Sequence, residues 1–187
     1  MEYINNNYFK MERIDGITLM SPRPNLNHMK IEFYLANELG TYLKDSVCNV
    51  LNETSLYLTN KVIDTRNNDE LLDFLRNTDN EVVPDLMVYC SKSNECRRGI
   101  VGIPKLIIEI LSSNRDDELI TKFKLYQRYG VSEYWIVDPL NKVTDVYNID
   151  ISTKKYVLSG KYNFSDTIKS VVFSNLDISL KDLDLLD

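Results

Sequence analysis

The sequence is poor in the side chains that usually bind zinc or form catalytic triads. It has one histidine, His28, and three cysteines, Cys48, Cys90 and Cys96, with no C-x-x-C pair. A multi-histidine metal centre and a cysteine-rich zinc site are therefore excluded, and any serine or cysteine triad would have to use His28. An odd number of scattered thiols is typical of a reducing cytoplasm, so we expect a cytoplasmic protein.

Glycine and long apolar runs are also scarce. The six glycines form neither a phosphate-binding loop nor a G-x-G-x-x-G turn. No apolar run approaches the roughly 18 residues that cross a membrane, and the N-terminus lacks the pattern of a signal peptide. If the protein is an enzyme, its carboxylates and lysines must carry most of the chemistry.

The charge balance excludes another class of protein. Lysine and arginine total 22, aspartate and glutamate total 28, and the net charge is −6. This balance argues against coating nucleic acid or anionic membrane through bulk charge, but it leaves room for a local basic groove. With 43% apolar and 27% charged residues, the chain can bury a core, and we expect one domain over residues 1–187.

Apolar periodicity and turn residues predict two helices and a series of strands. The helices cover 27–44 and 114–129, and Ser113 or Asn114 can cap the second one, which ends at Gly130 in a left-handed cap. The expected strands cover 13–20, 47–59, 82–90, 103–111 and 133–137, followed by meander strands near 143–149, 155–162 and 167–173.

The connections between these elements predict the fold class. A short link between 82–90 and 103–111 implies an antiparallel pair, whereas the strand–helix–strand unit at 103–137 implies a parallel right-handed crossover. We therefore expect an α/β domain with a central mixed sheet flanked by helices, and with extra meander strands. Residues 60–81 are polar, and we expect a surface loop excursion there with a helical turn or two over 70–75.

Two carboxylates are predicted to face each other across the antiparallel pair. Asp85 begins one strand and Glu109 lies near the end of the other. Their midpoint, residue 97, falls within a residue of the centre of the connection 91–102. Asp85 and Glu109 should therefore lie directly opposite, on the same face of the sheet.

Such a pair needs compensation. Two carboxylates about 4 Å apart repel by about 4 kcal/mol at an effective dielectric near 20, and their flanking residues are apolar. Mg²⁺ compensates best, and a shared proton or a nearby lysine are the alternatives. The alternative hypothesis is that both acids are structural: Asp85 is then a turn residue after Pro84, and Glu109 is a buried acid paired with a lysine or arginine.

The second helix offers a third polar side chain. Lys122 and Tyr126 are i, i+4 neighbours, and Lys122 lies at the edge of the buried stripe, from which it can reach the sheet. Beside a metal-held water such a lysine can orient the water or offset charge in the transition state. Alternatively, Lys122 is a solvated residue paired with Glu118.

Taken together, these segments resemble the Uma-two family of putative restriction endonucleases, within the PD-(D/E)XK nuclease-like superfamily. The resemblance spans nearly the whole chain, and the stretch at 130–139 is its most specific part. The matching segments are I-D-G at 14–16, M-S-P at 20–22, the helix start at His28, P-D at 84–85, I-I-E-I-L-S-S at 107–113, K-x-x-x-Y at 122–126 and G-V-S-E-Y-W-I-V-D-P at 130–139.

The resemblance implies a restriction endonuclease-like core and a phosphodiesterase site that depends on Mg²⁺ or Mn²⁺. Asp85 and Glu109 match the motif acids that bind the metal, and the backbone carbonyl of Ile110 is a further ligand. The sequence departs from the superfamily at Leu111, where the motif lysine is expected. Lys122 matches the helix lysine that takes this role in the family.

Further residues are candidates for accessory roles at the same site. His28 and Glu32 lie one turn apart on the first helix, and some relatives supply an extra acid from it. Tyr126, one turn from Lys122, is a third accessory candidate, and Glu12 is a fourth. For His28 the alternative is a partly buried residue on the apolar stripe of its helix.

Two functions from different classes follow. The first is hydrolysis of DNA phosphodiester bonds, and the second is a nuclease-like domain without catalysis that binds nucleic acid or self-associates. Hydrolysis of another phosphate ester is a third, and a homodimer formed through the meander strands fits either of the first two. The basic residues expected to contact the DNA backbone are Lys92, Arg97, Arg98, Lys154 and Lys155.

Overall fold

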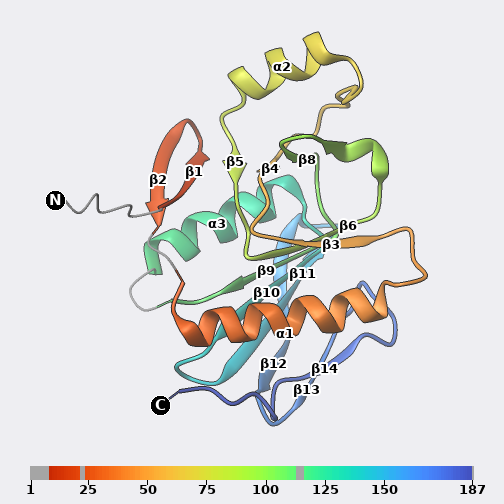
Figure 1. The fold of residues 1–187 in the computed structure, drawn as a ribbon. Coiled ribbons are helices and arrows are strands. Elements are labelled where there is room, and N and C mark those ends of the chain that lie inside the picture. Colours follow the sequence, from red (N-terminus) through yellow and green to blue (C-terminus); the bar gives the residue numbers. More distant parts are fainter. Residues whose placement is uncertain (1–8, 22–23, 113–115, 187) are drawn as a thin grey trace, which may run out of the picture.

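The computed structural model describes residues 9–21, 24–112 and 116–186. It has two six-stranded sheets, a two-stranded ribbon and three α-helices (Figure 1). The helices are α1 (Leu26–Tyr42), α2 (Asn68–Asn77) and α3 (Asp116–Tyr129), with a short 3₁₀ turn at Lys92–Asn94. The strands are β1 (Lys10–Ile14), β2 (Ile17–Ser21), β3 (Asn49–Asn52), β4 (Leu56–Tyr57), β5 (Glu81–Val82), β6 (Leu86–Tyr89), β7 (Glu95–Cys96), β8 (Gly99–Val101), β9 (Leu106–Ile110), β10 (Glu133–Asp138), β11 (Val143–Asp150), β12 (Lys155–Asn163), β13 (Thr167–Lys169) and β14 (Asp177–Ser179).

The main sheet confirms the expected fold class. Its strand order is β12-β11-β10-β9-β6-β3, with β6 antiparallel to β9 and β9 parallel to β10 across the α3 crossover. The chain order α1-β3-β6-β9-α3-β10 is the helix–strand–strand–strand–helix–strand core expected from the sequence. β11 and β12 extend it as the predicted meander.

The second sheet was not expected. Its order is β2-β1-β5-β4-β8-β7, and every strand in it has two to five residues. The strand expected at 82–90 is divided between the two sheets, because Pro84 has no N–H with which to continue a ladder. The connection at 91–102, for which no strand was predicted, contains β7 and β8.

The helices α1 and α3 cover opposite faces of the main sheet. Even-numbered residues of β6 and β9, such as Leu86 and Ile108, pack with Ile31 of α1 in one apolar cluster. Odd-numbered residues such as Met87 and Ile107 belong to the cluster that contains α3. Because side chains alternate along a strand, position 109 faces α3.

The local signals at the helix ends act as expected in most places. Asn25 caps α1 by accepting a hydrogen bond from the His28 N–H. Gly130 follows α3 with φ of +77°, the left-handed conformation of a C-cap. The proposed caps Ser113 and Asn114 lie outside the described residues. The polar segment 60–81 contains α2, which is longer than the one or two turns predicted.

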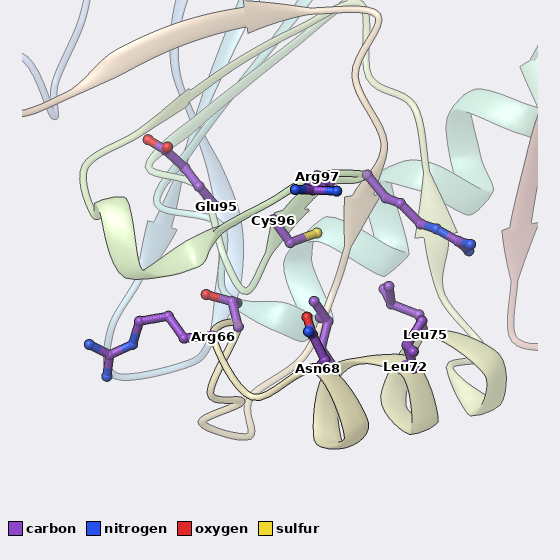
Figure 2. A pocket seen from close by; sticks show the side chains of 10 residues that line it. Arg66, Asn68, Leu72, Leu75, Glu95, Cys96 and Arg97 are labelled. Atoms are coloured by element: carbon purple, nitrogen blue, oxygen red, sulfur yellow. The ribbon is translucent and has the colours of Figure 1, made fainter.

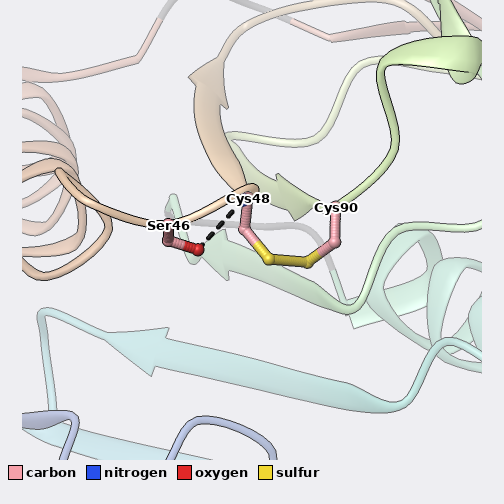
Figure 3. The surroundings of a disulfide bond; sticks show 3 residues. All are labelled: Ser46, Cys48 and Cys90. Atoms are coloured by element: carbon pink, nitrogen blue, oxygen red, sulfur yellow. Dashed lines mark hydrogen bonds between the residues drawn. A yellow bond between two sulfur atoms is a disulfide. The ribbon is translucent and has the colours of Figure 1, made fainter.

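Two of the three cysteines form a disulfide, contrary to the expectation of unpaired thiols. Cys48 and Cys90 are bonded, whereas Cys96 is free. They flank the first pair of the β3–β6 ladder, Asn49 opposite Tyr89, so the ladder brings them face to face (Figure 3). The argument from unpaired thiols for a reducing cytoplasm was therefore wrong.

No helix in the described ranges is long and apolar enough to cross a membrane.

Candidate active site

The predicted register of the two acid-bearing strands is confirmed. β6 and β9 pair Leu86 with Ile108 and Met87 with Ile107. Continued by one residue, this register places Asp85 opposite Glu109. Both carboxylates are almost fully buried, with exposed fractions of 3% and 6%. Their compensation must therefore come from neighbouring groups rather than from water.

Asp85 is surrounded by hydrogen-bond donors. Its Oδ2 accepts from the backbone N–H of Ile110 at 2.7 Å, and its Oδ1 accepts from Lys10 Nζ at 2.9 Å. His28 Nε2 lies 3.5 Å from the same Oδ1. Burial alone would raise the pKa of Asp85, but the nearby His28 and the charge of Lys10 outweigh it and hold the pKa well below its usual range.

Glu109 receives its partners from α3. The Tyr126 hydroxyl donates to Glu109 Oε1 at 2.7 Å, and Lys122 Nζ lies 3.2 Å from Oε1 and 3.3 Å from Oε2. The expectation that Lys122 and Tyr126 reach the sheet from one side of the helix is confirmed. Burial raises the pKa of Glu109 to about 7, more than the charge of Lys122 lowers it.

Lys122 is a buried bridge between two acids. Its side chain is 3% exposed, and its Nζ also lies 2.9 Å from Oε2 of Glu12 on β1. The alternative of a solvated lysine was therefore wrong, and the side chain of its suggested partner Glu118 lies outside the described part of the chain. The other oxygen of Glu12 accepts a 2.6 Å hydrogen bond from the Val83 N–H, which holds the carboxylate towards Lys122.

Lys10 is the site residue that sequence reasoning missed. It is on β1, two residues before Glu12, so both side chains lie on the same face of the strand. Burial alone would lower the pKa of Lys10, but the charge of Asp85 reverses this and raises it. The alternation K-x-E was a usable signal, but the strand was expected to begin only at residue 13.

The comparisons with known proteins show the family and the fold of the chain. The family model of Uma2, described as "Putative restriction endonuclease", matches residues 1–181. The chain belongs to the Uma2 family. A solved structure described as a putative nuclease belonging to DUF820, from Anabaena variabilis ATCC 29413, has the same fold, with a TM-score of 0.68 at 19% identity over 92% of this chain and 88% of that one. None of the curated proteins compared matches the chain.

The departure from the superfamily motif is visible in this Uma2 member. Leu111, in the place of the motif lysine, continues the backbone ladder by donating its N–H to the Val137 carbonyl at 2.8 Å. The ammonium group beside Glu109 comes from Lys122 on α3 instead. A positive charge thus stands beside the motif acid, although a different element supplies it.

The accessory candidates on α1, His28 and Glu32, differ in their distance from Asp85. His28, 2% exposed on α1, approaches Asp85 directly and lies 3.9 Å from Glu32 Oε2. Glu32 accepts a hydrogen bond from the Asn52 side chain at 3.0 Å, and His28 lies between it and Asp85. Burial raises the pKa of Glu32. His28 is thus buried, as the alternative of a residue on the apolar stripe predicted, and it also lies beside Asp85.

Carboxylate oxygens are ligands that Mg²⁺ prefers, and Asp85 and Glu109 place two buried carboxylates opposite each other. Lys10 and Lys122 lie beside these acids and offset part of their negative charge. Within the described ranges no three acidic, histidine or cysteine side chains are arranged to hold one ion together. One or two carboxylates with waters and a substrate phosphate are a usual set for Mg²⁺, and the described lysines provide the alternative compensation.

Proposed function

We propose that the protein is an endonuclease that hydrolyses DNA phosphodiester bonds with Mg²⁺ as its cofactor. The observation that carries the proposal is the buried group formed by Asp85 directly before β6, Glu109 on β9 and Lys122 on α3 of a nuclease-family chain. The raised pKa of Glu109 beside the lowered pKa of Asp85 supports it, because acid–base sites commonly hold paired groups with separated pKa values.

Each residue receives a role from its contacts. Asp85 and Glu109, with the carbonyl of Ile110, would hold Mg²⁺, which when bound polarises a phosphoryl oxygen and lowers the pKa of water. Lys122, fixed between Glu12 and Glu109, faces the charge that builds on the phosphate and stabilises it. Glu109 is held in place for its metal-binding role by the Tyr126 hydroxyl at 2.7 Å and by Lys122 Nζ at 3.2 Å.

Plasmid cleavage tests this proposal. Supercoiled DNA is incubated with Mg²⁺ or Mn²⁺ and the wild-type protein, Asp85→Asn, Glu109→Gln, or the control Asp177→Asn on the exposed strand β14. We expect the two site variants to lose cleavage by about a hundredfold or more and the control to match the wild type. Equal nicking by all four proteins would show that a contaminant cleaves the DNA.

A second candidate is a binding domain without catalysis. The specific observation in its favour is that Lys10, at 2.9 Å, already neutralises Asp85, while Leu111 replaces the motif lysine. Calorimetric titration with Mn²⁺ separates the candidates, because a domain that binds no metal at millimolar concentration cannot use the proposed chemistry. The control is the same titration of Asp85→Asn.

The proposal includes a cytoplasmic homodimer. β12 is the free edge of the main sheet, and its Val157 and Leu158 are about half-exposed, which suits pairing with a second copy. Sedimentation of the wild type and of Val157→Lys tests the dimer, because a charge on an edge strand opposes pairing. Cell fractionation tests the location, which the DNA substrate supports.

A further inference from the structure

A second site lies between α2 and the β7–β8 hairpin, at the far edge of the smaller sheet from β1. A cavity of about 550 Å³ opens there, within the size range of small-molecule sites. Leu72 and Leu75 of α2 point towards Cys96 of β7 and the turn that carries Arg97 (Figure 2). None of the catalytic candidates lines this cavity.

The rim of the cavity is positively charged. Arg97 and Arg98 form the two-residue turn between β7 and β8, because Cys96 pairs with Gly99. Both are exposed, and neither has an ion-pair partner among the described residues. Arg66 also lines the cavity, but its Nε pairs with Asp64 at 3.3 Å and its guanidinium points away from Arg97 (Figure 2), so the free charge comes from Arg97 and Arg98. The one acid of the lining, Glu95, accepts a hydrogen bond from the Tyr89 hydroxyl at 2.8 Å. This rim attracts an anion although the chain as a whole is acidic.

The floor of the cavity is apolar. Leu71 and Leu75 are buried, and Leu72 is 39% exposed. Leucine side chains beside free guanidinium groups fit a flat ring that carries a phosphate, because the ring packs on the apolar floor and on the arginine planes. A nucleotide that is not paired within a duplex has this chemistry.

The position of the cavity relates it to the candidate active site. In the sheet order, β7 is four positions from β1, which carries Lys10 and Glu12. At about 4.8 Å per strand the separation is roughly 19 Å. Within a duplex, one strand of DNA advances about 3.4 Å per nucleotide, so roughly six paired nucleotides between the active site and the cavity span this distance.

We propose that this cavity binds one unpaired nucleotide of the DNA strand that enters the candidate active site, about six nucleotides from the cleaved bond. The base lies on Leu71, Leu72 and Leu75, and its phosphate pairs with Arg97 and Arg98. The inference rests on the proposed nuclease function and adds a substrate preference to it. DNA with an unpaired extension binds more tightly than a blunt duplex.

Binding of two DNA probes tests the preference without cleavage. In the Asp85→Asn background, fluorescence anisotropy compares a blunt duplex with the same duplex carrying a single-stranded extension of six or more nucleotides. We expect the extension to tighten binding about tenfold or more, consistent with the energy of packing one base. Arg97→Ala/Arg98→Ala should remove this gain and lower the salt dependence, whereas the control Lys44→Ala/Lys169→Ala should keep the gain.

Two further measurements exclude misfolding and general loss of positive charge as explanations for weaker binding. Leu72→Glu, at a partly exposed position, leaves both arginines in place and should also remove the gain. With the disulfide intact, Cys96 is the one free thiol, so the extended probe should slow its alkylation and the blunt duplex should not. Equal binding of the two probes overturns the nucleotide site, and so does a gain in affinity that both the arginine and the leucine variants keep. In either case, loss of cleavage in Glu109→Gln would still support the proposed nuclease. Failure of every probe to bind overturns both.

Discussion

At the scale of single residues, the candidate site combines two acids whose surroundings move their pKa values apart. Asp85 meets Lys10 and His28, which favour its charged form, whereas Glu109 is buried deeply enough to favour its neutral form. Sequence reasoning reached this pair because it depends on one local register. It missed Lys10, because the contact with Asp85 joins residues 75 positions apart along the chain.

The pKa of Glu109 predicts a pH-dependent stability. Burial raises this pKa from the ordinary 4.5 to about 7 in the folded state, so the contribution of Glu109 to stability is complete below about pH 4.5 and is lost as the pH rises through 7. In the presence of a chelator, the free energy of unfolding of the wild type should therefore fall relative to Glu109→Gln between pH 4.5 and 7. Urea unfolding of both proteins measures it, and a constant difference across this window would contradict the assignment.

Removal of the bridging lysine should be destabilising. Lys122→Met leaves Glu12 buried without its 2.9 Å ion-pair partner, and breaking a buried pair costs about 3–5 kcal/mol. The exposed neighbour Lys124→Met is the matched control, with an expected change within about 0.5 kcal/mol. If both variants unfold at the same urea concentration, Lys122 does not have the buried role described.

At the scale of elements, the sequence predicted the pieces whose signals are local. The β6–β9 register and the α3 crossover follow from apolar runs and link lengths, and both were confirmed. The smaller sheet was missed because its strands are too short to show a period. Its pairings depend on distant partners, as in the single described pair between Arg13 of β1 and Glu81 of β5.

Gly99 tests the packing of this smaller sheet. A Cβ at Gly99 would lie 2.0 Å from the Ser55 carbonyl oxygen, and its φ of +145° is unfavourable for other residues. Gly99→Ala should therefore destabilise the protein by about 3 kcal/mol. Gly40→Ala, within α1 and with ordinary space around its Cβ, should instead stabilise it by about 0.5–1 kcal/mol. Thermal unfolding of the two variants measures both, and a harmless Gly99→Ala would contradict the β4–β8 contact.

At the scale of the whole molecule, the disulfide connects the start of β3 to the end of β6. The two cysteines are 42 positions apart, and the segment between them contains α2 and two strands of the smaller sheet, β4 and β5. The spacing of the cysteines did not reveal it, because the pairing depends on the β3–β6 ladder rather than on a motif. The cross-link therefore joins the ends of the segment that carries α2, which forms one side of the cavity of the further inference.

Loss of this cross-link should lower global stability. Cys48→Ser/Cys90→Ser should cost about 2–4 kcal/mol, because a closed loop of this length restricts the unfolded chain. Urea unfolding with and without a reductant measures the effect, and the reductant should shift the wild type but not the double variant. Cys96→Ser should respond to the reductant like the wild type, and an unresponsive wild type would contradict the disulfide.

The most direct test of the central claim is a double-mutant cycle on plasmid cleavage with Asp85→Asn, Glu109→Gln and the combined variant. If the two carboxylates serve one site, each single variant loses cleavage by about a hundredfold or more and the combined variant loses little beyond that. Full activity in either single variant, or losses that simply multiply in the combined one, would contradict a shared site.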